Sequence, residues 1–467
     1  MNCPFAQKGC GGCRGTDKMY GDTLKEKEAR VRTFFPQCEK ILGCETPLHS
    51  RNKLLRTFAN GKQSLYSGIY RAGTHQVISV NRCSLEDERL QSTAESITEI
   101  LKNAGFSAYR EDFHRGTLRH MILRVAPSTG QMLATLITGT ETLENGEAIA
   151  REIMLKNPAV KGVIHNYNPR ESSAVLGFKD RLLYGRDEIW DELCGLDVCL
   201  NSRSFYQVNA AQAEKLYDTA IRMASLTKED HVLDAYCGVG VIGMCAAVKC
   251  GSVTGVEIVK PAVACAEKAA RRNGLDNIAF IAGDVLKALR DKEKHFDCVF
   301  CDPPRAGLSE AFLRALAEHA PERIVYISCF PETLARDTGL LSEYGYAVNA
   351  VRPVDMFPYT EHVETVVLLV RKTPDAYVRI KMDMEDFNLT KSETKATYEE
   401  IKAYVKEQTG LNVTHLDIAQ TKRKSGIIER ENYNLPKSAD AKQPQCTKEK
   451  EEAILDALKH FQMISQS

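Results

Sequence analysis

Apolar runs alternate with helical stretches over residues 196–372, and this feature constrains the fold of the chain more than any other. The runs HVLDAYC, SVTGVE, NIAFIAG, FDCVFCD and RIVYISC alternate with stretches such as AVACAEKAARRNG and SEAFLRALAEH. This rhythm predicts an α/β domain with a doubly wound, Rossmann-like parallel sheet. Two further runs, YAVNAVRPVDMF and HVETVVLLVR, lie close together and predict a hairpin that ends the sheet.

The rest of the chain divides into segments of different character. Residues 1–50 are rich in cysteine at first and then helical and charged, as in TLKEKEARVRTFF. Residues 51–195 carry short β-branched and aromatic runs, interrupted by the helix-like LQSTAESITEILKNAG, and predict an α+β central domain with an antiparallel sheet. We expect a polar linker at 373–390 and a small helical unit at 391–467.

Charge and hydropathy exclude several classes of protein. The 62 basic residues balance 62 acidic residues, which excludes a histone-like polycation but not an enzyme with a local basic groove for nucleic acid. No stretch approaches the roughly 18 uncharged apolar residues of a membrane span. The start, MNCPFAQKGCGGC, lacks the apolar run of a signal peptide, so we expect a cytoplasmic protein.

A glycine loop follows the first strand of the predicted parallel sheet. Gly238 and Gly240 belong to a G-x-G-x-x-G pattern, which by itself also fits a nicotinamide or flavin site. Glu257 ends the second strand, where a carboxylate can hold ribose hydroxyls in either class of cofactor. Asp284 follows the third strand, where it can accept a hydrogen bond from an adenine amino group. The D-x-x-x-G-x-G run with these two acids favours S-adenosylmethionine over a dinucleotide.

A second group of reactive residues follows the later strands. Asp302 opens the run DPPR after the fourth strand, and Arg305 stands where amino-group methyltransferases carry an aromatic residue. Cys329 ends the fifth strand just before a helix start, whose dipole favours a thiolate. Glu364 begins the last strand, with His362 close by.

These groups make one reaction intelligible, the methylation of a pyrimidine carbon. Carbon 5 of uracil is too weak a nucleophile to attack a methyl group until a thiolate adds to carbon 6. A base must afterwards remove the proton from carbon 5, so that the thiolate can leave. We assign Cys329 as the nucleophile and Glu364 as the base; the alternative for Cys329 is a buried core cysteine.

Five ordered motifs together resemble the RNA (uracil-5-)-methyltransferase family over residues 1–372: FYQVN, DAYCGVG, DPPRAG, SCFPETLARD and DMFPYTEHVETV. The resemblance implies an S-adenosylmethionine methyltransferase domain at 196–372, with Cys329 and Glu364 catalytic. It implies a cofactor site formed by Gln207, Tyr236, Gly238, Gly240, Glu257, Asp284 and Asp302. Two positions depart from the family pattern: Phe330 replaces the usual Asn, and Val241 stands where relatives often carry Asn or Thr.

Four cysteines near the N-terminus form a candidate metal site. Cys3, Cys10 and Cys13 are spaced C-x6-C-x2-C, and Cys83 supplies a distant fourth thiol. Zinc and a [4Fe–4S] cluster both accept four thiolates, and the spacing alone does not separate them. The chain resembles the iron–sulfur 23S ribosomal RNA uracil methylases without an N-terminal TRAM domain, which favours the cluster. Uracil methylation needs no electron transfer, so we expect the cluster to serve structure or RNA folding.

The preferred function is methylation of carbon 5 of a uridine in 23S ribosomal RNA by a monomeric enzyme. The segments SRNKLLRTF, YRAGTHQ and HRGTLRHMILR mix basic and aromatic residues, which suits RNA contact, although a solvated sheet face is the alternative. Three rival functions stay open: tRNA uracil methylation, a non-catalytic redox-sensing RNA-binding protein, and an oxidoreductase using the glycine loop. The helical unit at 391–467 is interpreted as an RNA-docking accessory or a packing module.

Overall fold

The computed structural model describes residues 3–13, 18–61, 64–170, 174–291, 293–372, 398–425, 446–461 and 463. The chain forms two compact units, Met1–Thr373 and Pro374–Ser467. The linker predicted at 373–390 and the first residues of the predicted helical unit, 391–397, lie outside the described residues. Among the described helices, none is both long enough and apolar enough to cross a membrane.

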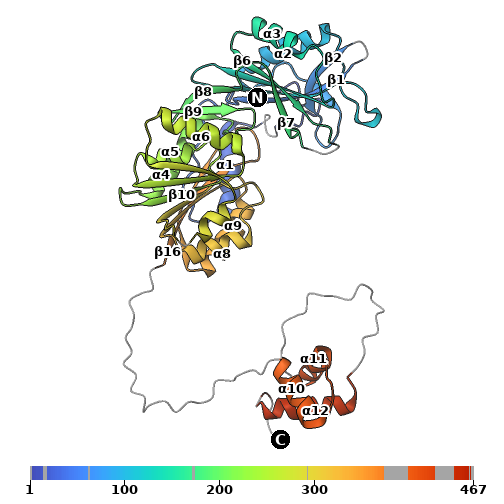
Figure 1. The fold of residues 1–467 in the computed structure, drawn as a ribbon, viewed down its shortest axis with the longest axis vertical. Helices are drawn as coiled ribbons and strands as arrows, with labels where there is room; N and C mark the ends of the chain where they lie inside the picture. The colour runs from blue at the N-terminus through green and yellow to red at the C-terminus, as the bar shows by residue number, and fades with distance from the viewer. Residues whose placement is uncertain are drawn as a thin grey trace. The chain divides into compact units, whose positions relative to one another are not determined.

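Residues 231–371 of the first unit contain a seven-stranded sheet (Figure 1). Its strands, in spatial order, are β12 (Ile278–Ala282), β11 (Ser252–Glu257), β10 (His231–Ala235), β13 (Cys298–Cys301), β14 (Arg323–Ser328), β16 (Glu364–Arg371) and β15 (Tyr346–Val354). The pairs from β12 to β14 are parallel, whereas β16 is antiparallel to both of its neighbours. The predicted doubly wound sheet with a terminal hairpin is therefore confirmed.

Helices cover both faces of this sheet. The first group is α4 (Ala210–Ala224), α5 (Val241–Ala247) and α6 (Lys260–Arg272). The second group is α7 (Val285–Arg290), α8 (Glu310–His319), α9 (Pro331–Glu343) and α1 (Tyr20–Phe34). Helix α6 shows the physical basis, because Ala262, Ala266 and Ala269 line its buried side and let the helix approach the sheet closely.

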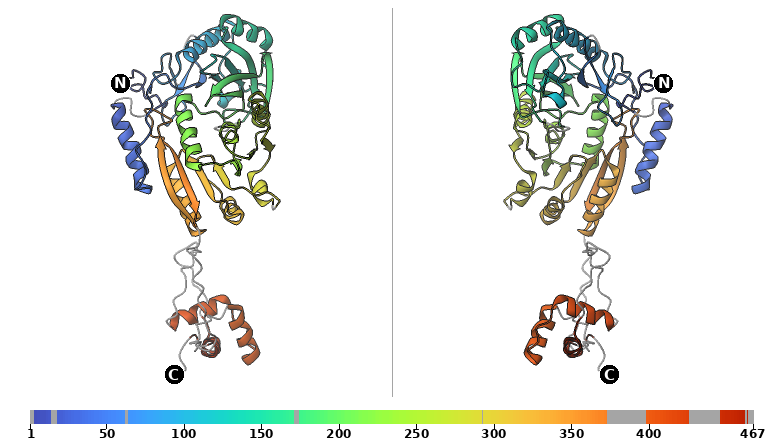
Figure 2. Two further views of the ribbon diagram at one scale, coloured as in Figure 1. Left: turned by 90° about the vertical axis from the view of Figure 1, so that its left-hand side faces the viewer. Right: turned by 90° about the vertical axis from the view of Figure 1, so that its right-hand side faces the viewer.

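Helix α1 is held to the end of the sheet by a buried ion pair. Lys27 donates to Asp355, which follows β15, and both side chains are almost fully buried. The Tyr20 hydroxyl donates to the same carboxylate at 2.6 Å. Figure 2 shows α1 alongside strands β15 and β16. The N-terminal segment is thereby fixed against the methyltransferase sheet, although it is far from that sheet in the sequence.

A second seven-stranded sheet is formed by residues 53–185. Its strands, in spatial order, are β3 (Val77–Ser79), β2 (Leu65–Tyr70), β1 (Lys53–Asn60), β4 (Leu118–Val125), β5 (Met132–Thr138), β6 (Val160–Tyr167) and β7 (Lys179–Gly185). The prediction of an antiparallel sheet is wrong for one pair, because β5 and β6 are parallel. A parallel connection needs a crossover, and α3 (Gly146–Lys156), which the sequence analysis did not predict, supplies it.

The two faces of this central sheet have different neighbours. Leu54, Met121 and Leu123 pack with α2 (Glu88–Asn103) and α3, which lie over one face (Figure 1). The alternate positions of β1 and β4, such as Lys53 and Arg124, point to the opposite face. Strand β4 is buried along its whole length, since both faces are covered there. A short 3-10 turn, Glu111–Phe113, precedes β4.

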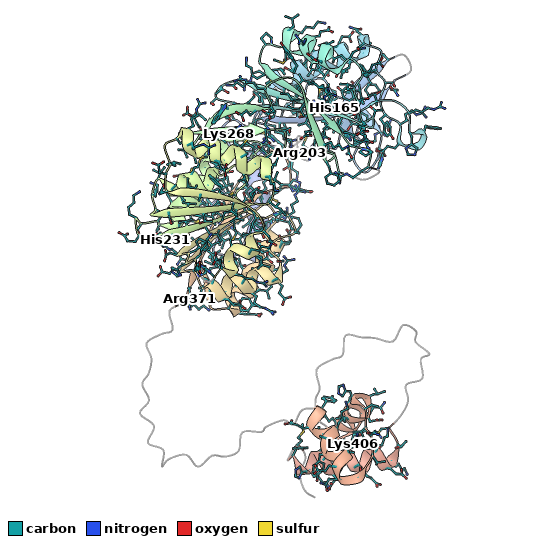
Figure 3. The ribbon with its side chains drawn as sticks, in the orientation of Figure 1. His165, Arg203, His231, Lys268, Arg371 and Lys406 are labelled. Atoms are coloured by element: carbon teal, nitrogen blue, oxygen red, sulfur yellow. The ribbon has the colours of Figure 1, made fainter. Side chains whose placement is uncertain are left out.

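A small hairpin joins the two sheets. It consists of β8 (Glu188–Leu193) and β9 (Leu196–Asn201), and the boundary predicted between residues 195 and 196 falls at its turn. Helix α6 holds the hairpin, because Lys268 pairs with Glu188 and Arg272 pairs with Asp197 at 2.8 Å. Arg203, which Figure 3 labels, follows β9 and pairs with Asp180 of β7 at 2.5 Å, so it ties the hairpin to the central sheet.

The second unit contains helices α10 (Tyr398–Thr409), α11 (His415–Lys424) and α12 (Lys448–His460). They surround a hydrophobic core of their own, in which Ile401, Val405, Ile418, Ile454 and Leu458 are fully buried. This unit therefore has the apolar interior of an independently packed helical module.

Candidate active site

The reactive side chains lie at one edge of the methyltransferase sheet. Strands β10 to β14 are parallel, so their carboxyl ends meet at this edge, and the antiparallel β16 begins there. The glycine loop follows β10, Glu257 ends β11, and Asp302 follows β13. His231 and Arg371 mark the opposite edge (Figure 3). Ligands of open α/β sheets bind at the carboxyl edge.

Strand register brings Cys329 and Glu364 to neighbouring positions. Ser328, the last residue of β14, pairs with Thr365 of β16. Cys329 follows Ser328, and Glu364 precedes Thr365, so the next pair along the two strands is Cys329 and Glu364. The Glu364 side chain is 4 % exposed, and its Oε2 atom has no hydrogen-bond partner among the described residues. A buried carboxyl without a hydrogen-bond partner lowers the stability of the folded state. The stability of the fold therefore does not explain a glutamate at this position, which points to a functional role.

Burial and mutual repulsion set the protonation of this pair. Burial raises the pKa of Glu364 well above its ordinary value, and the negative charge of Asp302 raises it further. Burial also raises the pKa of the half-buried Cys329 thiol, and the Glu364 carboxylate adds to this effect. Both groups therefore hold their protons more tightly than they would in water.

Arg305 opposes that shift. Its guanidinium hydrogen-bonds to the Cys329 thiol, and its charge lowers the pKa of both Cys329 and Glu364. The same side chain lies 3.4 Å from the Nε2 atom of His362. Arg305, which stands where amino-group methyltransferases carry an aromatic residue, lies next to the thiol. Its exposed position also leaves it open to a substrate.

Two further carboxyls belong to this edge of the sheet: Asp302 acts on the charge of the Cys329–Glu364 pair, and Asp234 lies near Asp302. Burial raises the pKa of Asp302 to about 7. Burial raises the pKa of Asp234, in β10, to about 8, although a hydrogen bond from the Gly243 N–H to its Oδ2 atom, at 2.8 Å, acts in the opposite direction. Clustered carboxyls with raised pKa values are typical of functional sites.

The glycine loop has the backbone that its sequence predicts. Gly238 and Gly240 have φ angles of +57° and +80°, which favour glycine. A Cβ atom at Gly240 would lie 2.5 Å from the Phe280 ring, whereas a Cβ atom at Gly238 would meet nothing closer than 3.9 Å. The Gly238 position therefore borders open space, which is where a ligand can approach the backbone.

The acids of the predicted cofactor site are oriented by backbone hydrogen bonds. Glu257 accepts from Gly238 N–H at 3.2 Å and from Val259 N–H at 2.8 Å. Asp284 caps α7 by accepting from Leu286 N–H at 2.9 Å, and its side chain is exposed. Both carboxylates keep acceptor sites for ligand hydroxyl or amino groups.

The other predicted cofactor residues flank the loop. Tyr236 has a φ angle of +63°, and its ring lies 5.7 Å from that of Phe312. Gln207 is 2 % exposed, and its backbone carbonyl accepts a hydrogen bond from the Asn52 side-chain amide at 2.9 Å. Of the two departures from the family pattern, Val241 is a buried residue at the start of α5. Phe330, the other departure, lies beneath the Arg30 guanidinium at 5.5 Å.

A cavity of about 510 Å³ lies next to the catalytic edge. Its walls come from the N-terminal loop at Gly11–Cys13, from the start of β1, and from the segments that carry Arg305 and His362. It thus spans the distance between the cysteine segment and the thiol neighbourhood. Its walls come from segments that are far apart in the chain, so no local sequence pattern predicts it.

The four N-terminal cysteines are close to one another. Burial raises the pKa of Cys13 to about 11, Arg51 lowers it, and the thiols of Cys83, Cys3 and Cys10 raise it further. Cys3, Cys10 and Cys83 also pack around one small apolar cluster. As the side chains stand, no three His, Cys, Asp or Glu residues of the described part of the chain form a group that would hold a metal ion.

Comparison with known proteins identifies the relatives of this chain. A family model described as tRNA (uracil-5-)-methyltransferase matches residues 195–372. An RNA methyltransferase of Bacillus cereus is 37 % identical over 380 residues, which cover 79 % of this chain and 82 % of the relative. A second one, from Halalkalibacterium halodurans, is 35 % identical over 381 residues, which cover 79 % and 83 %.

A solved structure shares the fold. The tRNA (uracil-54, C5)-methyltransferase of Pyrococcus abyssi, determined with S-adenosyl-L-homocysteine, matches with a TM-score of 0.65 and 24 % identity, covering 78 % of this chain and 86 % of that one. Sheet order, terminal hairpin and glycine loop define an enzyme with the S-adenosylmethionine-dependent methyltransferase fold. The chain belongs to the RNA (uracil-5-)-methyltransferase family.

Proposed function

We propose that this enzyme methylates carbon 5 of a uridine in RNA, with 23S ribosomal RNA as the preferred substrate and tRNA as the second candidate. The observation that carries the proposal is the pairing of a thiol and an unpartnered buried carboxyl at the ligand-binding edge. We expect the protein to act as a cytoplasmic monomer.

The proposed reaction begins at the thiol. The Cys329 sulfur, once deprotonated, adds to carbon 6 of the uracil ring, and the former double-bond electrons make carbon 5 nucleophilic. Arg305 favours the thiolate, because it already lies against the sulfur and lowers its pKa. The ring must leave its stack to present both carbons, so the target uridine is extruded from the RNA.

The reaction ends at the carboxylate. Carbon 5 carries both the new methyl group and its original proton after transfer. Glu364 removes that proton as a general base, the double bond re-forms, and the sulfur leaves carbon 6. The free Oε2 atom of Glu364 is suited to this role, because no described protein donor occupies it.

S-adenosylmethionine would supply the methyl group from its sulfonium centre. The open space at Gly238 and the oriented Glu257 carboxylate support a nucleoside site at the glycine loop. We assign Gln207, Tyr236, Gly240, Asp284 and Asp302 to the same site. Glu257 would accept from ribose hydroxyls and Asp284 from the adenine amino group.

Cys3, Cys10, Cys13 and Cys83 are proposed to hold a [4Fe–4S] cluster, with zinc as the alternative. Their support is chemical: four neighbouring thiols are the ligand set of either group. The cluster would then stabilise the N-terminal loop that forms one wall of the cavity.

The decisive experiment uses RNA in which uracil is replaced by 5-fluorouracil. The incubation includes S-adenosylmethionine. After methyl transfer, carbon 5 carries fluorine in place of a removable proton, so the Cys329–RNA bond persists and the complex survives denaturing electrophoresis. We expect the wild-type enzyme to form a covalent adduct with fluorouracil-containing transcripts of 23S ribosomal RNA. We expect the Cys329→Ala variant to form none. An adduct that forms equally well without Cys329, or no adduct with either ribosomal or transfer RNA, would contradict the proposal.

A further inference from the structure

Lys53 lies at the start of β1 in a position that the proposed chemistry does not explain. It lines the 510 Å³ cavity, as do Arg51 and Arg305. Within the described ranges its amino group has no ion pair or hydrogen bond, and the charge that acts on it is that of another cation, Arg124. Folding therefore leaves a half-buried lysine unneutralised at the wall of a cavity, which is unfavourable without a ligand.

A second cation lies directly opposite. Lys53 pairs with Arg124 across strands β1 and β4, so both side chains leave the same face of the sheet. Arg124 is 3 % exposed; one of its Nη atoms donates to the Ser204 carbonyl at 2.6 Å, and the other has no partner among the described residues. Burial and Arg124 lower the pKa of Lys53 to about 8.

Two carboxylates line the cavity, Glu86 and the exposed Glu361, against three cations, Lys53, Arg51 and Arg305. Both oxygens of Glu86 accept from Arg56, at 2.6 and 2.5 Å. Arg305 and Arg51 add positive charge to the same walls, and the Arg51 guanidinium donates to the Gly12 carbonyl at 3.3 Å. The cavity thus offers an anion several N–H donors and a positive potential.

We infer that Lys53, with Arg51 and Arg305, binds a backbone phosphate of the substrate RNA next to the extruded uridine. The inference rests on the proposed function, because it is the RNA backbone that must pass the Cys329 neighbourhood. The cavity reaches from Arg305, which touches the thiol, to the N-terminal loop. A phosphate held there would fix the strand so that its neighbouring ring faces the thiol.

Salt dependence tests the site. Each phosphate contact to single-stranded RNA contributes about 0.7 to the slope of log affinity against log salt. We expect Lys53→Gln to lower that slope by about 0.7 and to weaken binding of a 23S ribosomal RNA transcript about 10-fold at moderate salt, while Lys53→Arg keeps both near the wild-type values. Lys102→Gln, on α2 at the other face of the sheet, is the matched control and leaves both unchanged.

Protection from acylation gives an independent measurement on the wild-type protein. An amine-reactive reagent should modify Lys53 at about pH 8, and saturating RNA transcript should protect Lys53 but not Lys102, as read by peptide mass spectrometry. An unchanged salt slope in Lys53→Gln, unprotected Lys53, or no binding of ribosomal or transfer RNA by the wild type would overturn the phosphate site. If the fluorouracil adduct forms while the Lys53 measurements show no change, the methylation proposal stands and this inference fails. If Lys53 is protected but no adduct forms, Lys53 contacts RNA, whereas the methylation proposal and the placement of the phosphate beside an extruded uridine both fail.

Discussion

Cys329 and Glu364 occupy adjoining ends of two hydrogen-bonded strands, one parallel and one antiparallel to the rest of the methyltransferase sheet. Because β16 runs antiparallel to β14, its first residue, Glu364, lies at the carboxyl edge of the parallel strands. The hairpin at the end of the sheet therefore has a chemical consequence: it delivers a carboxyl to the thiol.

Glu364→Gln should stop the reaction after methyl transfer. Glutamine cannot accept the carbon-5 proton, so the enzyme remains bonded to RNA even when that RNA contains ordinary uracil. We expect a covalent complex to accumulate on denaturing gels, with turnover reduced about 1,000-fold or more. Cys446→Ala, a substitution of a thiol in the helical unit, is the control and should neither trap RNA nor lose activity. Free RNA and undiminished turnover in the Gln variant would exclude Glu364 as the base.

Arg305→Gln should shift the pH dependence of methylation to higher pH. The guanidinium lowers the pKa of Cys329, so removing its charge raises that pKa and leaves less thiolate at any given pH. Single-turnover rates measured against pH should show the rising limb displaced to higher pH, with Arg305→Lys closer to the wild type. A limb that stays in place while only the affinity for RNA falls would assign Arg305 to phosphate binding alone.

Asp234 should make the folded state less stable as the pH rises. Its pKa of about 8 in the folded protein exceeds its ordinary value of 3.8, so the folded state binds the proton more tightly, and stability falls between about pH 4 and pH 8. Asp234→Asn removes this term. We expect the difference in unfolding free energy between about pH 6 and pH 8 to shrink by about 1–3 kcal/mol in urea titrations. Asp276→Asn, at an exposed site, should leave the difference unchanged.

The two glycines of the cofactor loop should respond differently to alanine. Gly240→Ala places a Cβ atom 2.5 Å from the Phe280 ring at a φ angle of +80°, so it should lower the unfolding free energy by about 1–3 kcal/mol. Gly238→Ala meets open space, so it carries only the backbone strain of its φ angle of +57°, about 1 kcal/mol, and it should also weaken cofactor binding. Thermal unfolding and calorimetric titration with S-adenosyl-L-homocysteine separate the two effects. Equal losses of stability in both variants would contradict this distinction.

Cys13→Ser should remove the bound metal if the four N-terminal thiols act as ligands. Protein purified without oxygen should contain about four irons per chain and absorb in the visible range, and both signals should fall in the variant. Cys38→Ser, at a buried thiol beyond α1, is the matched control and should retain them. Zinc in place of iron would keep the ligand set and change the metal, whereas a metal content unaffected by Cys13→Ser would remove Cys13 from the site.

Much of the methyltransferase sheet could be predicted from local pattern. Each strand of residues 231–371 is a short apolar run, and the residue that ends a strand must lie at the sheet edge, so Glu257 and Cys329 could be located without coordinates. The central sheet was harder. Its strands are also short apolar runs, but the parallel β5–β6 pair depends on the crossover helix α3. The α3 sequence, GEAIAREIMLK, has a weak helical periodicity and follows a segment rich in turn residues.

By itself, the sequence determined the order of the elements and the identity of the reactive groups, because strand periodicity, glycine spacing and the DPPR and SCFPET runs are local properties. Only the tertiary structure decided which groups meet. The register of β14 and β16 joins Cys329 to Glu364, and the predicted domain boundary falls in the turn between β8 and β9. Segments that are far apart in the chain enclose the cavity at Lys53. Long-range pairing and burial create these relationships, and they also shift the pKa values on which the chemistry depends.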